Sequence, residues 1–275
     1  MTTDPRDADL RAADPPAADS RAADSRGDTA TSLPVTVIPD EEIERVLVVA
    51  AHPDDADFGS AGTVATWTKR GIEVSYLILT DGQAGGFDES VDRAEIPAIR
   101  RAEQTTAAAE VGVTDVHFAG YVDGELEMTH GLVRAIVRVI RQVRPQRMVF
   151  QSPARRFDVV AASHPDHLAA GEATIRALYP FSRNPFAYPE LLADEKLEAW
   201  TVREMWLTAH PTQNHAVDVT DVVEAKLAAI FAHESQHVDP SALRGWVNTW
   251  LTSVAAEFGL GDGRLAEGFA VYQTG

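Results

Sequence analysis

The sequence contains no cysteine, and this absence limits the kinds of site that it can build. Disulfides, thiolate metal centres and cysteine nucleophiles are all excluded. Any bound metal ion would have to be held by histidine nitrogens and carboxylate oxygens. The chain offers nine histidines and 42 Asp and Glu residues for that purpose.

Long apolar runs and basic residues are also scarce. No window reaches the roughly 18 consecutive apolar residues of a membrane-spanning helix, and the first residues lack the pattern of a secretory signal. We therefore expect a cytoplasmic protein without a membrane partner. There are 24 Lys and Arg against 42 Asp and Glu, and the formal net charge is -18. Because such a charge repels polyanions, nucleic acid is not expected as a partner.

Three common catalytic signatures are missing from the sequence. No G-x-G-x-x-G follows the first predicted strand, and neither the Walker motif G-x-x-x-x-G-K-[ST] nor the G-x-S-x-G elbow occurs. Dinucleotide-dependent dehydrogenases, P-loop NTPases and serine hydrolases each depend on one of these motifs. The sequence therefore argues against all three classes.

The first part of the chain differs in composition from the rest. In residues 1–40, Ala, Asp, Arg, Pro and Ser dominate and large apolar residues are nearly absent. Such a segment cannot bury enough surface to offset the entropy lost on ordering. We predict a disordered low-complexity tail over residues 1–40 and a single folded domain over residues 41–275, which could form an oligomer.

Strand and helix patterns alternate along the domain, which is typical of an α/β fold with a mostly parallel sheet and helices on both faces. The predicted strands are Arg45–Ala51, Glu73–Leu79, Asp115–Phe118, Arg147–Gln151, Val202–Thr208 and Phe269–Tyr272. The predicted helices are Gly59–Arg70, Pro97–Val111, Gly131–Val143, Leu168–Leu178, Asp221–His233 and Ser241–Phe258.

Two His-Pro-Asp segments give the main functional signal. His52-Pro-Asp-Asp55 directly follows the first strand, and His164-Pro-Asp-His167 precedes a helix after the fourth. Loops at the carboxyl ends of parallel strands can converge on one site. Either segment alone could be a helix start, where Asp and Pro are also common. Two copies after two strands favour a metal site.

The spacing indicates a role for each residue of the two segments. His52 and Asp55 are one helical turn apart, and His167 could complete a three-ligand site for Zn²⁺. Asp54 does not easily share that face, so it is free to act as general base on a metal-activated water. His164 could reach a developing oxyanion. Histidine and carboxylate ligands also accept Fe²⁺ and other divalent ions, so zinc is a preference only.

A rival metal motif and two arginines leave alternatives open. His233-Glu-Ser-Gln-His237 matches H-E-x-x-H, in which two histidines on a helix hold zinc and the Glu is the base. Its helix should stop at once because Val238-Asp-Pro240 follows, and no later histidine offers a third ligand. Arg100 and Arg101 open a helix near the glycine-rich segment Thr80–Gly86. Either one could contact a substrate, or both could be solvated.

Taken together, these motifs resemble those of the PIG-L, or LmbE-like, family of zinc-dependent N-deacetylases. The resemblance runs from about Val46 to Phe269. The pieces that carry it are Ala51-His-Pro-Asp-Asp55, His164-Pro-Asp-His167, Thr80-Asp-Gly82, Arg100-Arg-Ala-Glu103, Gly120-Tyr-Val-Asp-Gly-Glu125 and Ala266-Glu-Gly-Phe269. His233-x-Ser-Gln236 is also similar to a family feature, which makes the H-E-x-x-H match a coincidence.

The resemblance implies a Rossmann-like fold and hydrolysis of an N-acyl group, commonly N-acetyl, from a glucosamine-type small molecule. The site residues that it implies are His52, Asp55 and His167 as zinc ligands, Asp54 as general base, His164 as oxyanion donor and Arg100 as substrate contact. The chain departs from the family at Ala56-Asp57, where a Glu usually continues the first motif. The acid is shifted by one position, which puts the orientation of a metal ligand in question.

Two other functions are compatible with the sequence. One is an amidase acting on thiol conjugates of a glucosaminyl-inositol, as the resemblance to some family members suggests. The other is a sugar- or nucleotide-binding module without catalysis, in which the His-Pro-Asp turns only cap helices. The second alternative predicts a purified protein without stoichiometric metal.

Overall fold

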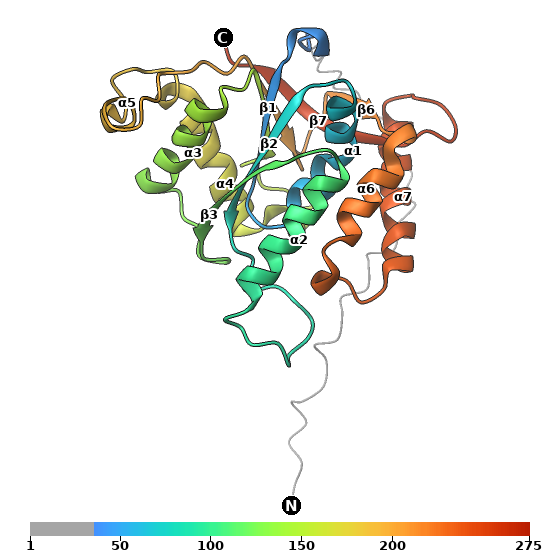
Figure 1. Cartoon of the computed structure of the whole chain (residues 1–275). Coiled ribbons are helices and arrows are strands. Elements are labelled where there is room, and N and C mark those ends of the chain that lie inside the picture. Colours follow the sequence, from blue (N-terminus) through green and yellow to red (C-terminus); the bar gives the residue numbers. More distant parts are fainter. Residues whose placement is uncertain (1–35) are drawn as a thin grey trace, which may run out of the picture. The chain divides into compact units, whose positions relative to one another are not determined.

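The computed structural model describes residues 36–275 (Figure 1). Most of the tail predicted over residues 1–40 lies outside the described residues. Ile38, however, is buried, and its main-chain N–H donates to the Glu204 carboxylate at 2.8 Å. The stretch 36–40 thus packs with the domain. Within the described range, no helix has the length and apolar character needed to cross a bilayer.

A seven-stranded sheet forms the centre of the domain, in the order β3-β2-β1-β4-β5-β7-β6. The strands are β1 (Arg45–Ala50), β2 (Glu73–Thr80), β3 (Asp115–Tyr121), β4 (Arg147–Gln151), β5 (Glu204–Thr208), β6 (His215–Asp218) and β7 (Ala266–Gln273). Strands β1 to β5 are parallel, whereas β7 runs antiparallel to both of its neighbours. Strands β2 and β3 are added in turn on one side of β1, and β4 then pairs with β1 on its other side. In such sheets, ligands bind at this reversal, beyond the carboxyl ends of the strands.

Helices cover both faces of the sheet, as the sequence predicted. They are α1 (Asp55–Lys69), α2 (Ile96–Glu110), α3 (His130–Val143), α4 (Pro165–Arg176), α5 (Pro189–Ala193), α6 (Val223–Phe231) and α7 (Pro240–Glu257). Helices α1, α2, α6 and α7 pack on one face, and α3 and α4 pack on the other (Figure 1). A short π-helix, Ala177–Phe181, follows α4.

Two hydrophobic cores hold these layers together. Val46 and Val48 of β1 belong to the core under α1, whereas Leu47 and Val49 belong to the core under α3 and α4. Successive side chains of a strand point to opposite faces, so a strand covered on both sides must be apolar throughout. This explains the continuous apolar run before His52 and confirms the predicted α/β fold class.

Three local differences from the prediction have physical causes. Helix α1 begins at Asp55 rather than Gly59, because the carbonyl of Asp54 accepts the N–H groups of Asp57 and Phe58 at 2.9 and 3.0 Å. The first His-Pro-Asp motif therefore leads directly into α1, with Asp54 at the N-cap position and Asp55 as the first helical residue. Strand β6 and helix α5 were not predicted. Each has only four or five residues, and β6 is defined by its pairing with β7.

Candidate metal centre

The two His-Pro-Asp segments meet at the carboxyl ends of β1 and β4, as expected for adjacent parallel strands. They border a cavity of about 300 Å³. Its lining consists of His52, Asp54, Ala84, Gly85, Arg100, Asp123, Ala161, His164 and His167. Five of the six site residues predicted from the sequence therefore line one cavity, and Asp55 lies directly behind His52.

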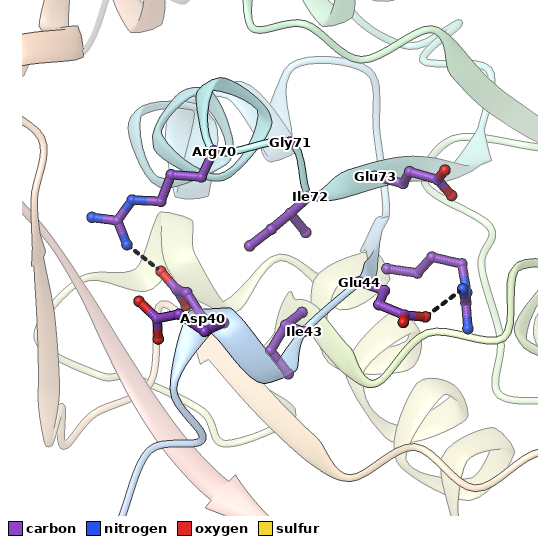
Figure 2. A pocket seen from close by; sticks show the side chains of 9 residues that line it. Asp40, Ile43, Glu44, Arg70, Gly71, Ile72 and Glu73 are labelled. Atoms are coloured by element: carbon purple, nitrogen blue, oxygen red, sulfur yellow. Dashed lines mark hydrogen bonds and ion pairs between the residues drawn. The ribbon is translucent and has the colours of Figure 1, made fainter.

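A larger hollow of about 530 Å³ lies at the opposite ends of β1 and β2 (Figure 2). Both of its arginines are already paired: Arg70 contacts Asp40 at 2.8 Å, and Arg45 contacts Glu44 at 3.0 Å. Among the described residues that line it there is no histidine. The smaller cavity, which collects histidines and carboxylates, is therefore the better candidate for chemistry.

Asp55 bridges the two histidines that were predicted to bind metal with it. One of its oxygens, Oδ2, lies 3.2 Å from Nδ1 of His52, and the other, Oδ1, lies 3.1 Å from Nε2 of His167. The side chains of all three are 12 to 15% exposed, and those of His52 and His167 line the cavity. Oδ2 also accepts the main-chain N–H of His52 at 2.7 Å, which fixes the turn. The predicted ligand atoms thus converge from the turn after β1, from α1 and from α4.

The electrostatics of this cluster fit a bound cation. Burial alone would lower the pKa of His52, but the carboxylates of Asp123 and Asp55 raise it to about 11. Burial is likewise outweighed at His167, where Asp55 raises the pKa of the imidazole. The carboxylates therefore stabilise positive charge at this point, whether protons or a divalent ion carry it. Nitrogen and carboxylate oxygen atoms are also the donors that zinc prefers when no thiolate is available.

Two carboxylates that the sequence did not assign orient His52. Nε2 of its ring lies 3.0 Å from Asp123 and 3.1 Å from Asp166. Asp166 is completely buried and accepts the N–H groups of Gly124 and Leu126 at 2.8 and 3.2 Å. With Nε2 donating to these groups, Nδ1 is the ring atom turned toward Asp55 and free to bind metal. Asp123 and Asp166 both lie in family motifs, and that was the only signal for them.

His164 lies beside the predicted ligands with a defined tautomer. Its ring centroid is 4.8 Å from that of His52 and 5.3 Å from that of His167. Nδ1 accepts the main-chain N–H of Asp166 at 3.2 Å, so the neutral ring carries its proton on Nε2. Burial and the nearby His52 and His167 lower the pKa of His164. The ring nitrogens of the three histidines can also approach within 4.8 Å of one another, so His164 is close enough to be an alternative ligand.

Asp54 sits in an uncommon backbone conformation beside this cluster. Its φ is 94°, a region that residues other than glycine rarely adopt and that typically costs about 1–3 kcal/mol. Its main-chain N–H donates to Oε1 of Gln104 at 2.9 Å, which holds the turn. Burial and the charge of Asp55 raise the pKa of the Asp54 carboxyl to about 7, although Arg100 acts in the opposite direction. A carboxyl with that pKa is suited to exchanging protons near neutral pH.

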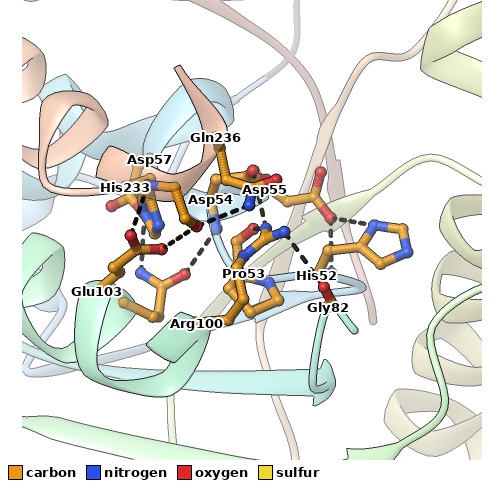
Figure 3. Close-up of polar contacts among 12 residues, drawn as sticks. His52, Pro53, Asp54, Asp55, Asp57, Gly82, Arg100, Glu103, His233 and Gln236 are labelled. Carbon is orange, nitrogen blue, oxygen red and sulfur yellow. Dashed lines mark hydrogen bonds and ion pairs between the residues drawn. The ribbon is translucent and has the colours of Figure 1, made fainter. Parts of the chain in front are cut away.

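Arg100 is buried beside Asp54 rather than extended into the cavity (Figure 3). It donates from Nη2 to the Asp54 carboxylate at 3.0 Å and to the carbonyl of Pro53, and from Nη1 to the carbonyl of Gly82 at 3.4 Å. A Cβ at Gly85 would lie 2.4 Å from Nη1, so any larger residue there would displace the Arg100 guanidinium. Arg101, the other candidate, pairs with Asp81 through two bonds of 2.8 and 2.9 Å. Of the two arginines, only Arg100 reaches the cavity wall.

Asp57 and His233 form a separate buried pair behind Asp54 (Figure 3). Both are completely buried, and Nε2 of His233 lies 2.9 Å from Oδ2 of Asp57. The same oxygen accepts from Nε2 of Gln104 at 2.8 Å. The shifted acid at position 57 therefore has no direct contact with a predicted ligand. It acts on the site through Gln104 and the main chain of Asp54.

The H-E-x-x-H alternative is not supported by this geometry. Helix α6 ends at Phe231, and Glu234–Gln236 is a single 3₁₀ turn, so the two histidines do not share a helical face. His233 faces Asp57, whereas Nε2 of His237 lies 2.6 Å from the carbonyl of Ile230. Within residues 36–275, the clusters of potential metal ligands all contain His52 and neither of these histidines.

Two of the supporting motifs also contact each other. Glu103 of α2 accepts from both the N–H and the hydroxyl of Ser235, at 2.7 and 2.8 Å. This joins Arg100-Arg-Ala-Glu103 to His233-x-Ser-Gln236 at the rim of the site. Fold and site together define an α/β protein with a histidine and carboxylate centre at the carboxyl edge of its sheet.

Comparison with known proteins points to the same family as the sequence motifs. The family model described as PIG-L, GlcNAc-PI de-N-acetylase, matches residues 47–178. Diacetylchitobiose deacetylase from Thermococcus kodakarensis is 34% identical over 232 residues, covering 84% of each chain. A probable N-acetyl-alpha-D-glucosaminyl L-malate deacetylase 2 from Bacillus subtilis is 30% identical over 70% of this chain and 83% of its own length.

A solved structure agrees with these relatives. N,N'-diacetylchitobiose deacetylase from Pyrococcus horikoshii superposes with a TM-score of 0.75, at 30% identity and with 85% of each chain covered. The chain belongs to the PIG-L family, as its motifs predicted.

Proposed function

We propose that this protein is a metal-dependent hydrolase that removes the N-acetyl group of a glucosamine-type sugar. The observation that carries the proposal is the bridging of His52 and His167 by Asp55, with the Asp54 carboxyl beside them in the same cavity. The relatives support the substrate class, since the ones named above deacetylate N-acetylglucosamine compounds by their descriptions. A cavity of about 300 Å³ is at the lower end of the usual range for small-molecule sites.

The chain's own residues divide the work as follows. His52, Asp55 and His167 would hold Zn²⁺ or another divalent ion, which lowers the pKa of water and polarises the acyl carbonyl. Asp54 takes the proton from the attacking water and later returns it to the departing amine. His164 donates from Nε2–H to the carbonyl oxygen as negative charge develops on it. Arg100 holds the Asp54 carboxylate and contributes positive charge at the edge of the cavity toward the polar part of the sugar.

Two substitutions separate metal binding from catalysis. Asp55→Ala should lose bound metal and activity together, because it removes the group that joins both imidazoles. His164→Ala should keep stoichiometric metal and lose about 10²–10³-fold in kcat, the usual effect of losing one oxyanion donor. Metal analysis of both purified variants makes the distinction. Full metal content in Asp55→Ala would show that the ligand set is wrong, and a wild-type protein that holds no metal would favour the non-catalytic binding module.

The metal and the sugar scaffold need separate measurements. The chelated protein should be reconstituted with Zn²⁺ or Fe²⁺ in turn, since the same ligands accept both. The substrates to compare are N-acetylglucosamine, its disaccharide, its inositol glycoside and a thiol conjugate of glucosaminyl-inositol. Release of acetate from one of the first three supports the proposal. Cleavage of the thiol conjugate alone would favour the amidase.

A further inference from the structure

A fully buried ion pair lies under helix α1 and makes no contact with the cavity. Nζ of Lys226, from α6, and Oε1 of Glu267, from β7, are 2.6 Å apart, and both side chains are completely excluded from solvent. Neither residue lines the cavity described above.

Apart from the bond between them, the side-chain hydrogen bonds of this pair all go to the main chain of α1. Glu267 accepts the N–H of Gly62 at 2.9 Å and the N–H of Thr63 at 2.7 Å. Lys226 donates to the carbonyls of Asp57 at 2.9 Å and Phe58 at 2.6 Å. In an ideal α-helix, the N–H of Gly62 would bond to the carbonyl of Phe58. Lys226 and Glu267 thus bind the acceptor and the donor of the same i to i+4 pair of α1, namely the carbonyl of Phe58 and the N–H of Gly62.

The absence of a side chain at Gly62 leaves room for the Glu267 carboxylate beside α1. A Cβ at Gly62 would lie 3.2 Å from Oε1 of Glu267 and 2.8 Å from the side chain of Val219. The Nζ group of Lys226 also lies 5.5 Å from the centre of the Trp250 ring. Its three hydrogen bonds go to Glu267 and the two carbonyls, so each of its protons has an acceptor.

Burying such a pair is costly in general. The desolvation of two charges often exceeds their mutual attraction, and apolar replacements can be as stable or more so. Stability alone is therefore a weak reason for this arrangement. A better reason is that the start of α1 must keep one particular backbone conformation, because this segment begins at the candidate metal centre.

The held segment is continuous with the site residues. The N–H groups of Asp57 and Phe58 donate to the carbonyl of Asp54, and Lys226 binds the carbonyls of the same two residues. The turn that carries Asp54 and Asp55 is therefore fixed at its far end by the pair.

We propose that Lys226 and Glu267 are positioning residues, which hold the first turns of α1 so that Asp55 and Asp54 keep the geometry needed for metal binding and proton transfer. They touch neither substrate nor metal. The effect on metal binding and proton transfer rests on the proposed function, whereas the positioning of α1 rests on the main-chain hydrogen bonds of the pair.

The test compares two buried glutamates. Glu267→Gln removes the negative charge of the pair and should lower the affinity for Zn²⁺, measured by competition with a chelator, by about 10–100-fold, as for other groups that orient ligands. It should also speed hydrogen exchange in the peptide spanning residues 52–63 of the metal-free protein. The matched control is Glu204→Gln. Glu204 is equally buried and lies 2.7 Å from Arg147, but at the opposite ends of the strands.

The double variant Lys226→Met with Glu267→Gln leaves no unpaired buried charge, so it keeps the test decisive if the single variant does not fold. The proposal is supported if Glu267→Gln or the double variant weakens zinc binding and speeds hydrogen exchange in residues 52–63 while Glu204→Gln does neither. It is overturned if the 267 variants match wild type, or if both glutamate variants change the two readouts equally. A wild-type protein that binds no divalent metal ion would contradict the proposed function, and the exchange measurement would still decide the positioning role.

Discussion

The main-chain N–H of Asp54 donates to Oε1 of Gln104 at 2.9 Å, and Nε2 of the same Gln104 side chain donates to Oδ2 of Asp57 at 2.8 Å. Gln104 therefore joins the candidate base to a buried acid that has no place in the cavity itself. Since the φ of Asp54 is 94°, this contact stabilises a conformation that the chain would otherwise avoid.

Replacing Gln104 by Leu should reduce kcat by about 10–100-fold and leave KM nearly unchanged. The substitution leaves the N–H of Asp54 without an acceptor, so the base is less often in its working position. Gln146→Leu is the control, because Oε1 of Gln146 accepts the N–H of Arg45 at 2.8 Å away from the site. Steady-state kinetics should separate the two, and equal kcat in both variants would contradict the role given to Gln104.

Arg100→Met should move the acid limb of the kcat/KM profile to higher pH. Burial and Asp55 raise the pKa of Asp54 to about 7, and Arg100 lowers it. Loss of the guanidinium raises that pKa further, and a base must be ionised to act, so activity falls most on the acid side. A bound cation would lower the pKa in both proteins, which preserves the direction.

The control for this shift is Arg101→Met, whose wild-type side chain is paired with Asp81. Its acid limb should coincide with that of the wild type. A rise in KM of equal size at every pH, with no displacement of the limb, would instead assign Arg100 to the substrate alone.

Asp166→Asn should weaken metal binding by about 10–100-fold without unfolding the protein. The buried carboxylate accepts from Nε2 of His52 at 3.1 Å and fixes which ring nitrogen faces Asp55. Asp115→Asn removes a carboxylate 3.2 Å from His117 on the exposed part of β3 and should have no effect. Zinc titration by calorimetry measures both. Wild-type affinity in Asp166→Asn would mean that Asp123 is sufficient to orient the ring.

Gly62→Ala should destabilise the fold by about 1–3 kcal/mol, because its Cβ would lie 2.8 Å from the side chain of Val219. A Cβ at Gly245, within α7, would have no neighbouring atom within 4 Å, so Gly245→Ala should stabilise the fold by about 0.5–1 kcal/mol. Urea unfolding gives both values. A Gly62→Ala protein as stable as wild type would mean that α1 shifts freely away from Val219.

The sequence was sufficient where local pattern determines structure. The apolar run before His52 predicted β1 to within one residue, and Arg147–Gln151 was predicted with the bounds that β4 has. Thr129 directly precedes α3 and is a typical capping residue, and its hydroxyl accepts the N–H of Leu132 at 3.2 Å. In each case the signal lies in neighbouring residues, namely a buried strand's composition or a capping side chain.

Contacts between distant residues were not predictable in the same way. The departure at Ala56-Asp57 put the orientation of a metal ligand in question. The partners of Asp57 are Gln104 and His233, which are 47 and 176 positions away. Asp166 was visible only as the middle of a motif, since its contact with His52 depends on β1 lying next to β4. Motif spacing predicted the ligand set, whereas the contacts of the groups beside it depend on strand order.

The bond from Glu267 to Gly62 spans 205 positions of sequence, and this has a consequence for how the protein matures. A ribosome releases Asp54 and Asp55 long before β7 is made, and domains complete their folding as units. Until β7 pairs with β5, the main chain of α1 has no Glu267 to bind. Tight metal binding should therefore appear only after the last strand is in place, and chains cut short before residue 266 should remain metal-poor even when most of the sheet has formed.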